Sequence, residues 1–377
     1  MRLATNAFLH VNRLGYAMLR PVIFRSSAQT AHEHMITLLR RTDNAAMSTA
    51  LSGLHKLAFL QQQVSVGGVT LAAPLILAAG LVKGDGFESE QAALAAVRTG
   101  RNIIPGWRAL PRLVGLVEFG SFTRWPRLGN SGTIVWRDAS TRSSQNRVGL
   151  KNPGASAAAE FLALHKSHLP QQFGINIAVS PGVTDREQER IEVLESLAMF
   201  VERGVFPAWF TLNLSCPNTD DDPSGNQTAE KTHSLCSAAV NYLKSAAQPV
   251  PLWVKIGPTL ADYQYNVLMQ VFAETDVRAV VATNTLPMPT PDDANTTAGI
   301  GGGRLHCRSI EVVRRLAEEK GKHAYTVDII GCGGVLDGTT YREFIHSGAQ
   351  AVQYWTALIY RGPLAAALIL SEAEYAH

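Results

Sequence analysis

The sequence predicts a (β/α)8 barrel with an N-terminal helical extension. From Leu75 onward, short apolar runs alternate with Ala- and Leu-rich stretches of helical period, and this alternation indicates parallel strands joined by crossover helices. Eight such runs in roughly 300 residues suit a barrel. Almost every run ends in small polar or glycine-rich residues, where a barrel binds its ligands. A doubly wound open sheet is the alternative, but no GxGxxG motif follows the first run.

The composition supports a folded chain with a large core. Hydrophobic residues make up 46% of the 377 residues and charged residues 17%. This composition is not that of a disordered chain. The net charge of +3 is too small to argue for nucleic acid. Four scattered cysteines form no CxxC pair, so they suggest neither a disulfide framework nor a zinc site, and they fit a reducing compartment.

Residues 1–63 are expected to be helical. Up to Ala31 the chain carries four arginines and no acid, among many apolar residues. No apolar run approaches the roughly 20 residues of a spanning helix, so we interpret the segment as a basic amphipathic helix on a membrane surface. A mitochondrial presequence and an ordinary packed helix are the alternatives. Further helices are predicted at Thr30–Arg41 and Ala50–Gln63.

The barrel elements follow in order after Gly67-Gly68. Arg98–Arg112 is predicted to be an inserted loop because glycines and prolines interrupt it. The helix candidates include Ser89–Val97, Arg190–Glu202, Leu235–Ala246 and Ser309–Glu319. The strand candidates are Leu75–Ala79, Val114–Gly120, Phe173–Ala178, Trp209–Leu214, Leu252–Ile256, Ala279–Ala282, Thr326–Ile330 and Ala351–Tyr354.

The fourth strand candidate ends in the most reactive group of residues. Its apolar run stops at Asn213, and Ser215, Cys216 and Asn218 follow with a proline among them. A thiol has an ordinary pKa near ~8.5, so Cys216 could act as a base if the site gives it access and thiolate character. The alternative is the common role of a free cysteine, a small buried hydrophobe. The flanking asparagines favour the first interpretation.

Two lysines suggest a bound flavin ring, and glycine clusters near the strand ends suggest a site for a phosphate group. A cation near the N1 and O2 edge of a flavin stabilises the reduced anion, which would explain Lys83 and Lys255 at strand ends, although Lys83 could also be a surface residue. Barrels often bind phosphate after strands 7 and 8, and Gly333-Gly334 lies there. Gly301–Gly303 could add a third set of amides, unless these glycines only form tight turns.

Several motifs together resemble the dihydroorotate dehydrogenase family, from about Arg20 to Pro363. The strongest are Leu77–Gly80, Asn213–Thr219, Val254–Pro258, Ala282–Thr285 and the stretch from Gly348 to Pro363. The resemblance implies an FMN-binding barrel at residues 64–377, preceded by an extension at 1–63 that associates with the membrane and forms a quinone tunnel. It implies that Cys216 removes the C5 proton of dihydroorotate while a hydride leaves C6 for the flavin, and that orotate forms.

The resemblance also implies further site residues. Substrate contacts fall at Lys83, Asn146, Asn213, Asn218, Asn284 and Thr285. Cofactor contacts fall at Ala79, Gly80, Lys83, Ser121, Asn176, Asn213, Lys255, Thr283, Gly303, Gly333, Gly334, Trp355 and Thr356. Quinone contacts fall at His32, Arg137 and Trp355. No metal is expected.

The subclass features are mixed. The basic N-terminal helices and the Val352–Pro363 ending are similar to class 2, whose members are membrane-associated and pass electrons to quinone. Cys216 and Leu150 instead follow the soluble class 1 enzymes. The loop after Thr219, usually Pro-Gly-Leu-Arg in the family, is Asp220-Asp221-Asp222-Pro223 here. It would lie over the substrate, and three acids there disfavour an anionic orotate.

Three interpretations follow from these features. The first is a quinone-linked dihydroorotate dehydrogenase, peripheral to the bacterial inner membrane, or to the mitochondrial inner membrane if the N-terminus is a targeting segment. The second is a diverged FMN oxidoreductase acting on another dihydropyrimidine or small cyclic substrate, which the acidic loop favours. The third is a non-catalytic barrel homologue.

Overall fold

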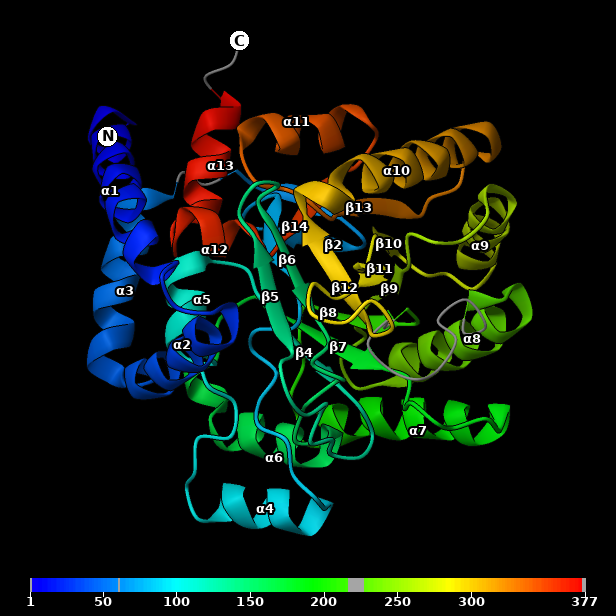
Figure 1. The fold of residues 1–377 in the computed structure, drawn as a ribbon. Helices are drawn as coiled ribbons and strands as arrows, with labels where there is room; N and C mark the ends of the chain where they lie inside the picture. The colour runs from blue at the N-terminus through cyan, green and yellow to red at the C-terminus, as the bar shows by residue number, and fades with distance from the viewer. Residues whose placement is uncertain (1, 60–61, 216–226, 375–377) are drawn as a thin grey trace.

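Eight parallel strands form a barrel whose order follows the chain. A computed structural model describes residues 2–59, 62–215 and 227–374. The sheet runs β3-β14-β13-β10-β9-β8-β7-β4, and a bridge between Leu77 and Val117 joins its two edges. The (β/α)8 prediction is confirmed (Figure 1). The strands are β3 (Leu75–Leu77), β4 (Glu118–Phe122), β7 (Gly174–Ala178), β8 (Trp209–Asn213), β9 (Leu252–Ile256), β10 (Ala279–Ala282), β13 (Asp328–Cys332) and β14 (Ala351–Tyr354).

Helices cover the outside of this barrel. Because the strands are buried on both faces, they read as continuous apolar runs in the sequence. Their positions match the predicted ones closely, except at β4. Four of the helices were expected from periodicity, namely those now seen as α4, α7, α8 and α10. The covering helices are α4 (Glu90–Arg98), α6 (Ala155–Leu164), α7 (Arg186–Val201), α8 (Ala229–Ser245), α9 (Asp262–Glu274), α10 (Gly303–His323), α11 (Gly338–His346), α12 (Ala357–Arg361) and α13 (Ala365–Glu374).

A short hairpin closes the floor of the barrel, at the amino ends of the strands. It consists of β1 (Val64–Val66) and β2 (Val69–Leu71), which pair antiparallel. The indole Nε1 of Trp253 donates to the carbonyl of Gly67 at 3.0 Å, and Trp253 stacks on Trp209 with ring centroids 4.4 Å apart. Gly67 has a φ of +58°, and a Cβ there would lie 2.2 Å from the indole. Only glycine fits this turn against the floor.

Three helices precede the barrel and pack against one side of it. They are α1 (Arg2–Ile23), α2 (Ala28–Thr42) and α3 (Ala45–Ala58). Ser27 and Asn44 cap α2 and α3, because their side chains accept from backbone amides of the first turns. Five large apolar residues of α1 are exposed, at Val11, Leu14, Met18, Leu19 and Val22. None of the described helices is long and apolar enough to cross a membrane.

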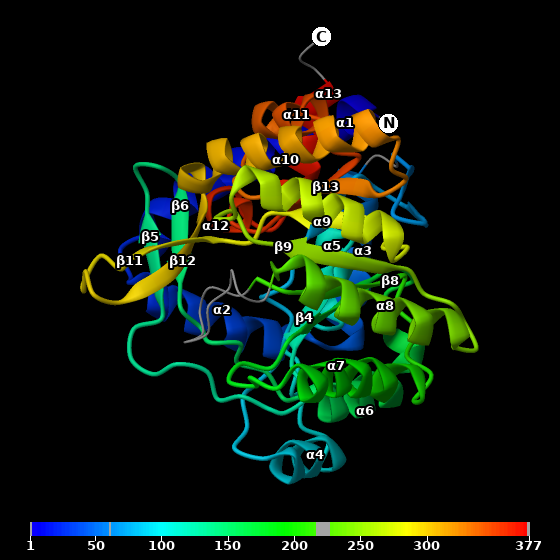
Figure 2. The same cartoon turned by 90° about the vertical axis from the view of Figure 1, so that its right-hand side faces the viewer.

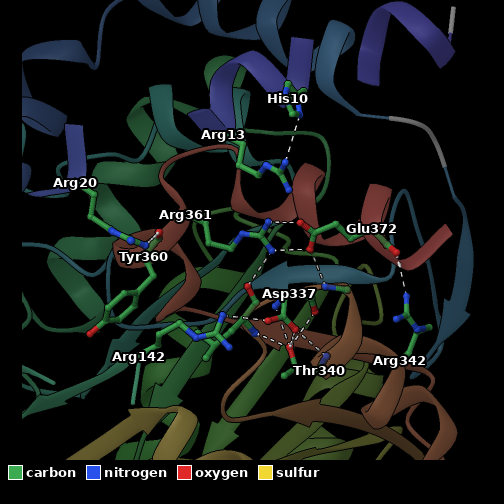
Figure 3. A network of polar contacts seen from close by, with 12 residues as sticks. His10, Arg13, Arg20, Arg142, Asp337, Thr340, Arg342, Tyr360, Arg361 and Glu372 are labelled. Atoms are coloured by element: carbon green, nitrogen blue, oxygen red, sulfur yellow. Dashed lines mark hydrogen bonds and ion pairs between the residues drawn. The ribbon is translucent and has the colours of Figure 1, made fainter. Parts of the chain in front are cut away.

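Polar contacts fasten α1 to the last elements of the chain (Figure 3). The Arg20 guanidinium donates to the carbonyl of Tyr360 at 3.0 Å, and the Tyr16 hydroxyl donates to the carbonyl of Ile359 at 2.8 Å. The inner face of α1 is also apolar, since Leu9 is buried with Leu364 and Leu368 in one cluster. The first and last helices of the chain therefore form one packed unit.

A four-stranded antiparallel sheet was not predicted. Its order is β11-β12-β6-β5, and it stands at the edge of the barrel beside α2, on the left in Figure 2. Its strands arise from two loops that follow barrel strands β4 and β10. They are β5 (Val135–Asp138), β6 (Ser143–Asn146), β11 (Leu286–Pro289) and β12 (Thr297–Gly302).

The region at Arg98–Arg112 is only partly a loop. It ends in α5 (Ala109–Val114), and Pro111 is tolerated because it lies in the first turn. The predicted strand at Val114–Gly120 is therefore wrong at its start. The turn at Gly115, with a φ of +88°, ends α5, and β4 begins at Glu118. Leu39 of α2 packs against Gly106 in this region.

Candidate functional site

A large cavity lies where the barrel strands end. It encloses about 1280 Å³, part of it open to solvent. Barrel strands, the antiparallel sheet and α2 contribute to its wall. Many of the residues that were predicted to lie at strand ends are close together in this cavity. Of the predicted site residues, the lining includes His32, Ala79, Gly80, Lys83, Ser121, Asn146, Asn176, Asn213, Lys255, Thr283, Asn284, Thr285, Gly333, Gly334, Trp355 and Thr356.

Two asparagines from different strands meet on one side of the cavity. The Asn284 amide donates to the Asn213 Oδ1 at 3.3 Å and to the carbonyl of Ser215 at 2.7 Å. The Ser215 amide in turn donates to Asn213 Oδ1 at 3.2 Å. These bonds fix the orientation of both side-chain amides. The wall they form is suited to a planar ligand rich in amide and carbonyl groups.

A buried carboxylate lies below the cavity and is linked to Lys255. Glu118 is fully buried, and one of its oxygens accepts from the Gln353 amide at 3.0 Å. The Lys255 ammonium donates to the Gln353 Oε1 at 3.2 Å. Trp209 and Thr211 also donate to Glu118, at 2.9 and 2.8 Å. Gln353 therefore connects a buried negative charge with the cation in the cavity wall, and paired burial of both charges is the arrangement that proteins tolerate.

Asn176 supplies a test of whether a flavin fits. Its amide nitrogen donates to Glu118 Oε1 at 2.7 Å, which fixes the flip of the amide. Its Oδ1 is buried and has no hydrogen-bond partner among the described residues, and Asn176 lines the cavity. A buried acceptor without a partner is costly. The imide N–H of a flavin is a donor of the kind that this oxygen lacks, so the site fits the group.

Loops after the seventh and eighth strands supply the groups expected to hold a phosphate. Gly333 and Gly334 have φ values of +120° and +86°, and they follow β13 at the cavity wall. Thr356 follows β14, and its hydroxyl lies 3.1 Å from the hydroxyl of Ser144. Gly303 does not line the cavity, since it packs against the carbonyl of Thr141. Its cofactor role stays a prediction.

The three predicted quinone residues lie in different surroundings. His32 and Trp355 line the cavity, and burial, with the charges of Lys83 and Lys151, lowers the pKa of His32. Arg137 does not line it. Its guanidinium donates to the carbonyl of Ser26 at 2.8 Å and stacks on the Phe24 ring. Arg137 thus holds the connection between α1 and α2, and its contact with quinone stays a prediction.

Sequence reasoning missed several residues of the site. Gln353 and Glu118 lie inside barrel strands. The signal that could have identified them is a polar residue within an otherwise apolar run. Cys332 lines the cavity with its thiol 3.6 Å from the Lys255 ammonium, and burial raises the pKa of this thiol. Ser144 and Gln145 come from the antiparallel sheet and had no signal, because that sheet was not anticipated.

Three predictions lie outside the described residues. They concern Cys216 as base, Asn218 as substrate contact and the acidic loop at Asp220–Asp222. The described chain resumes at Gln227, whose side chain accepts from the Gly257 amide at 2.7 Å. β8 ends at Asn213 in the cavity wall, and the description of this part of the chain stops two residues later, at Ser215.

Comparisons with known proteins agree with the motifs. Residues 61–375 match the family model of dihydroorotate dehydrogenase. A dihydroorotate dehydrogenase (quinone) of Chromobacterium violaceum is 31% identical over 358 residues, which cover 92% of this chain and 94% of the relative. One of Bordetella avium is 32% identical with the same coverage. The crystal structure of Eimeria tenella DHODH in complex with ferulenol has a TM-score of 0.70 at 22% identity and covers 93% of both chains, which shows the fold.

Proposed function

The chain belongs to the dihydroorotate dehydrogenase family, and from this membership we propose that it oxidises dihydroorotate to orotate and passes the electrons to a quinone. The dehydrogenases of Chromobacterium violaceum and Bordetella avium carry the quinone-linked name. The observation that carries the proposal is the convergence of Asn146, Asn213 and Asn284 with Lys83 and Thr285 on one cavity. These amides, hydroxyl and cation suit a pyrimidine carboxylate.

The cofactor of this proposal is FMN, which residues of the strand-end cavity would hold. When bound, a flavin supplies an acceptor for hydride and returns the electrons singly or in pairs to a second substrate. Asn176, Thr283 and Lys255 would contact the isoalloxazine ring or the ribityl chain, and the Lys255 cation would stabilise negative charge on the reduced ring. Gly333, Gly334, Trp355 and Thr356 would hold the phosphate. The unpartnered Asn176 oxygen supports this assignment.

Cys216 is the base for the substrate. Its thiolate takes the proton from C5 of dihydroorotate, and the hydride departs from C6, so that the C5–C6 double bond of orotate forms. Asn213, Asn218 and Asn284 hold the substrate amides, and Lys83 balances its carboxylate. The support for Cys216 and Asn218 is their place in the sequence directly after β8.

The quinone is reached through the N-terminal helices, which lie on the membrane surface. His32 and Trp355 in the cavity wall and the exposed apolar residues of α1 support this part of the proposal. The burial that lowers the pKa of His32 favours its neutral form at neutral pH. A neutral imidazole suits contact with an uncharged quinone. The membrane is the bacterial inner membrane, or the mitochondrial inner membrane if the N-terminus is a targeting segment.

A second candidate is an FMN oxidoreductase that acts on another dihydropyrimidine or small cyclic substrate. The sequence of Asp220–Asp222 favours it, because three carboxylates near the substrate would repel an anion such as orotate. A neutral ring would suffer no such repulsion. The two candidates share the barrel, the flavin and the base, and they differ only in the ring that is oxidised.

Anaerobic addition of L-dihydroorotate to the FMN-loaded protein tests the proposal. We expect the absorbance of the oxidised flavin to bleach rapidly. The same experiment with Cys216→Ala should show flavin still bound and bleaching slowed by roughly 10²- to 10⁴-fold, as for a lost general base. A flavin that dithionite reduces but dihydroorotate does not would contradict the substrate, and unchanged bleaching in the variant would remove Cys216 from the reaction.

A further inference from the structure

A second cavity, which shares no lining residue with the cavity at the strand ends, lies between the N-terminal extension and the barrel. We call it the α3–α5 cavity, because α3 and α5 form two of its walls, and the third is the 3-10 helix Lys166–His168 that follows α6. Its space of about 620 Å³ is partly open to solvent. The residues that line it are Ala45, Ser48, Thr49, Ser52, Arg108, Arg112, Ser167 and His168. Two guanidiniums, an imidazole and four hydroxyls thus share this lining, and no carboxylate does.

The two arginines of the α3–α5 cavity lie on one face of one helical turn. Arg108 and Arg112 are four residues apart, and Arg108 already has helical backbone angles. Like charges at this spacing destabilise a helix. Each side chain is partly buried, and within the described residues neither guanidinium is in ion-pair distance of a carboxylate, although eighteen other ion pairs are present there. An anion between them would relieve the repulsion.

Serines from α3 form the opposite wall. Ser48 and Ser52 are also four residues apart, and the Ser52 hydroxyl donates to the carbonyl of Ser48 at 2.8 Å. Ser48 is 9% exposed, and its hydroxyl has no hydrogen-bond partner among the described residues. A buried hydroxyl without a partner is uncommon and costly. Ser48 also lines the cavity, so this donor without a partner belongs to the cavity wall.

The backbone beneath the arginines is held in place before any ligand binds. Asp43, which follows α2, accepts from the amides of Gly106, Arg108 and Ala109 at 2.7, 3.1 and 3.0 Å. The Asn102 side chain donates to the same carboxylate at 2.8 Å. Asp43 is therefore occupied with backbone amides rather than with a guanidinium. A fixed backbone lowers the entropy cost of ordering the arginines on a ligand.

Another arginine-rich cavity, beneath α1, differs in its charges. Its lining holds four arginines, of which Arg13 and Arg20 come from α1, together with Asp337 and Glu372. The other two are Arg142 and Arg361. Arg142 pairs with Asp337, and Arg361 pairs with Glu372 (Figure 3). Its acids already neutralise these two arginines. The α3–α5 cavity, in contrast, combines arginines with hydroxyls and has no acid in its lining.

We propose that the α3–α5 cavity binds a phosphate group through Arg108, Arg112 and the hydroxyl of Ser48. Guanidinium forks and hydroxyls are the groups that bind phosphate oxygens most specifically. The group can come from free phosphate or from the phosphomonoester headgroup of a lipid, and both present the same oxygens. This site is separate from the cavity at the strand ends, and its existence does not depend on the proposed reaction.

Calorimetric titration of inorganic phosphate into the full-length, FMN-loaded protein tests this site. Loading with FMN fills the other phosphate-binding loops, and a constant ionic strength with chloride removes general salt effects. We expect saturable binding by the wild type. The Arg108→Gln, Arg112→Gln double variant should bind at least about tenfold more weakly, because hydrogen bonds to charged groups contribute this much or more. Arg112→Gln alone serves if the double variant does not fold.

Arg314→Gln is the matched control, since Arg314 is an exposed residue of α10 outside this cavity. It should bind phosphate as the wild type does. A parallel titration uses phosphatidylcholine vesicles with and without phosphatidic acid. If the wild type binds inorganic phosphate and the double variant does not, free phosphate is sufficient as the ligand. If the double variant differs from the wild type only in its binding to vesicles with phosphatidic acid, the ligand is the lipid headgroup. The proposal is overturned if neither ligand responds, or if the control and the double variant lose binding equally.

Discussion

Glu118 is a carboxylate without exposed surface that accepts hydrogen bonds from four side chains. Two of these donors, Asn176 and Gln353, also belong to the wall of the strand-end cavity. The side-chain oxygen of Gln353 accepts a hydrogen bond from the Lys255 ammonium. The negative charge of Glu118 therefore offsets part of the positive charge that Lys255 presents to the cavity. A residue that touches no ligand can in this way tune the field at the ligand.

We expect Glu118→Gln to raise the midpoint potential of the bound flavin. Without the carboxylate, Lys255 stabilises a reduced, anionic flavin more strongly, and a shift of about 30 mV corresponds to about 1.4 kcal/mol for a two-electron couple. Spectroelectrochemical titration of the loaded protein measures it. Glu160→Gln, which removes a carboxylate from a surface ion pair with Arg98, is the control and should leave the potential unchanged. An unchanged potential in Glu118→Gln would show that the carboxylate has only a structural role.

At the scale of elements, α1 has two apolar faces with different partners. Leu9 on its inner face is buried against the barrel, whereas Val11, Met18 and Val22 on its outer face are 69%, 74% and 56% exposed. Exposed apolar residues repeated along one side of a basic helix are typical of a helix that lies in a membrane interface.

Met18→Glu with Val22→Glu should therefore weaken binding to anionic vesicles without unfolding the protein. Each charge replaces apolar surface that would enter the acyl boundary, while the inner face of α1 is untouched. Co-sedimentation with vesicles measures binding, and reduction of a water-soluble quinone checks that the site is intact. Glu substitutions at Tyr263 and Val267, exposed on α9, are the matched control. Equal sedimentation of both variants would place the membrane contact elsewhere.

The strands that could be predicted from the sequence are the ones that are buried on both faces. Strands such as β9 and β10 are buried on both faces, so their apolar runs were evident in the sequence. The antiparallel sheet was missed because β5 and β6 carry polar residues such as Arg137 and Gln145, and β11 contains two prolines that suggest a loop. The strand-end residues could be predicted because a barrel brings these ends together. The link from Glu118 to Lys255 could not, since it depends on side chains from three strands.

At the scale of the whole molecule, the extension and the barrel share a hydrophobic cluster. Leu9 and Ala58 from the extension are buried with Leu364 and Leu368 from the end of the barrel. A cluster shared in this way couples the stability of both parts, because neither can lose its partner without exposing apolar surface.

We expect Leu9→Ala to lower the free energy of unfolding by about 2–5 kcal/mol, the usual range for a buried leucine. The unfolding should remain one transition, with far-UV circular dichroism and flavin release changing together. Leu14→Ala, at a half-exposed position of the same helix, should change stability little. A separate early transition in Leu9→Ala would mean that the extension unfolds independently of the barrel.

The packing of α1 against α12 and α13 also sets an order of events during synthesis. The helix that leaves the ribosome first finds its partners, near Tyr360 and Leu368, only when almost the whole chain has been made. At the usual rates of translation this delay is roughly 15 to 70 seconds. Until then α1 can pack against α3, but its contacts with α12 and α13 are missing. The apolar surface that will later meet Leu364 and Leu368 is therefore exposed on the nascent chain, where a chaperone or a lipid surface can cover it.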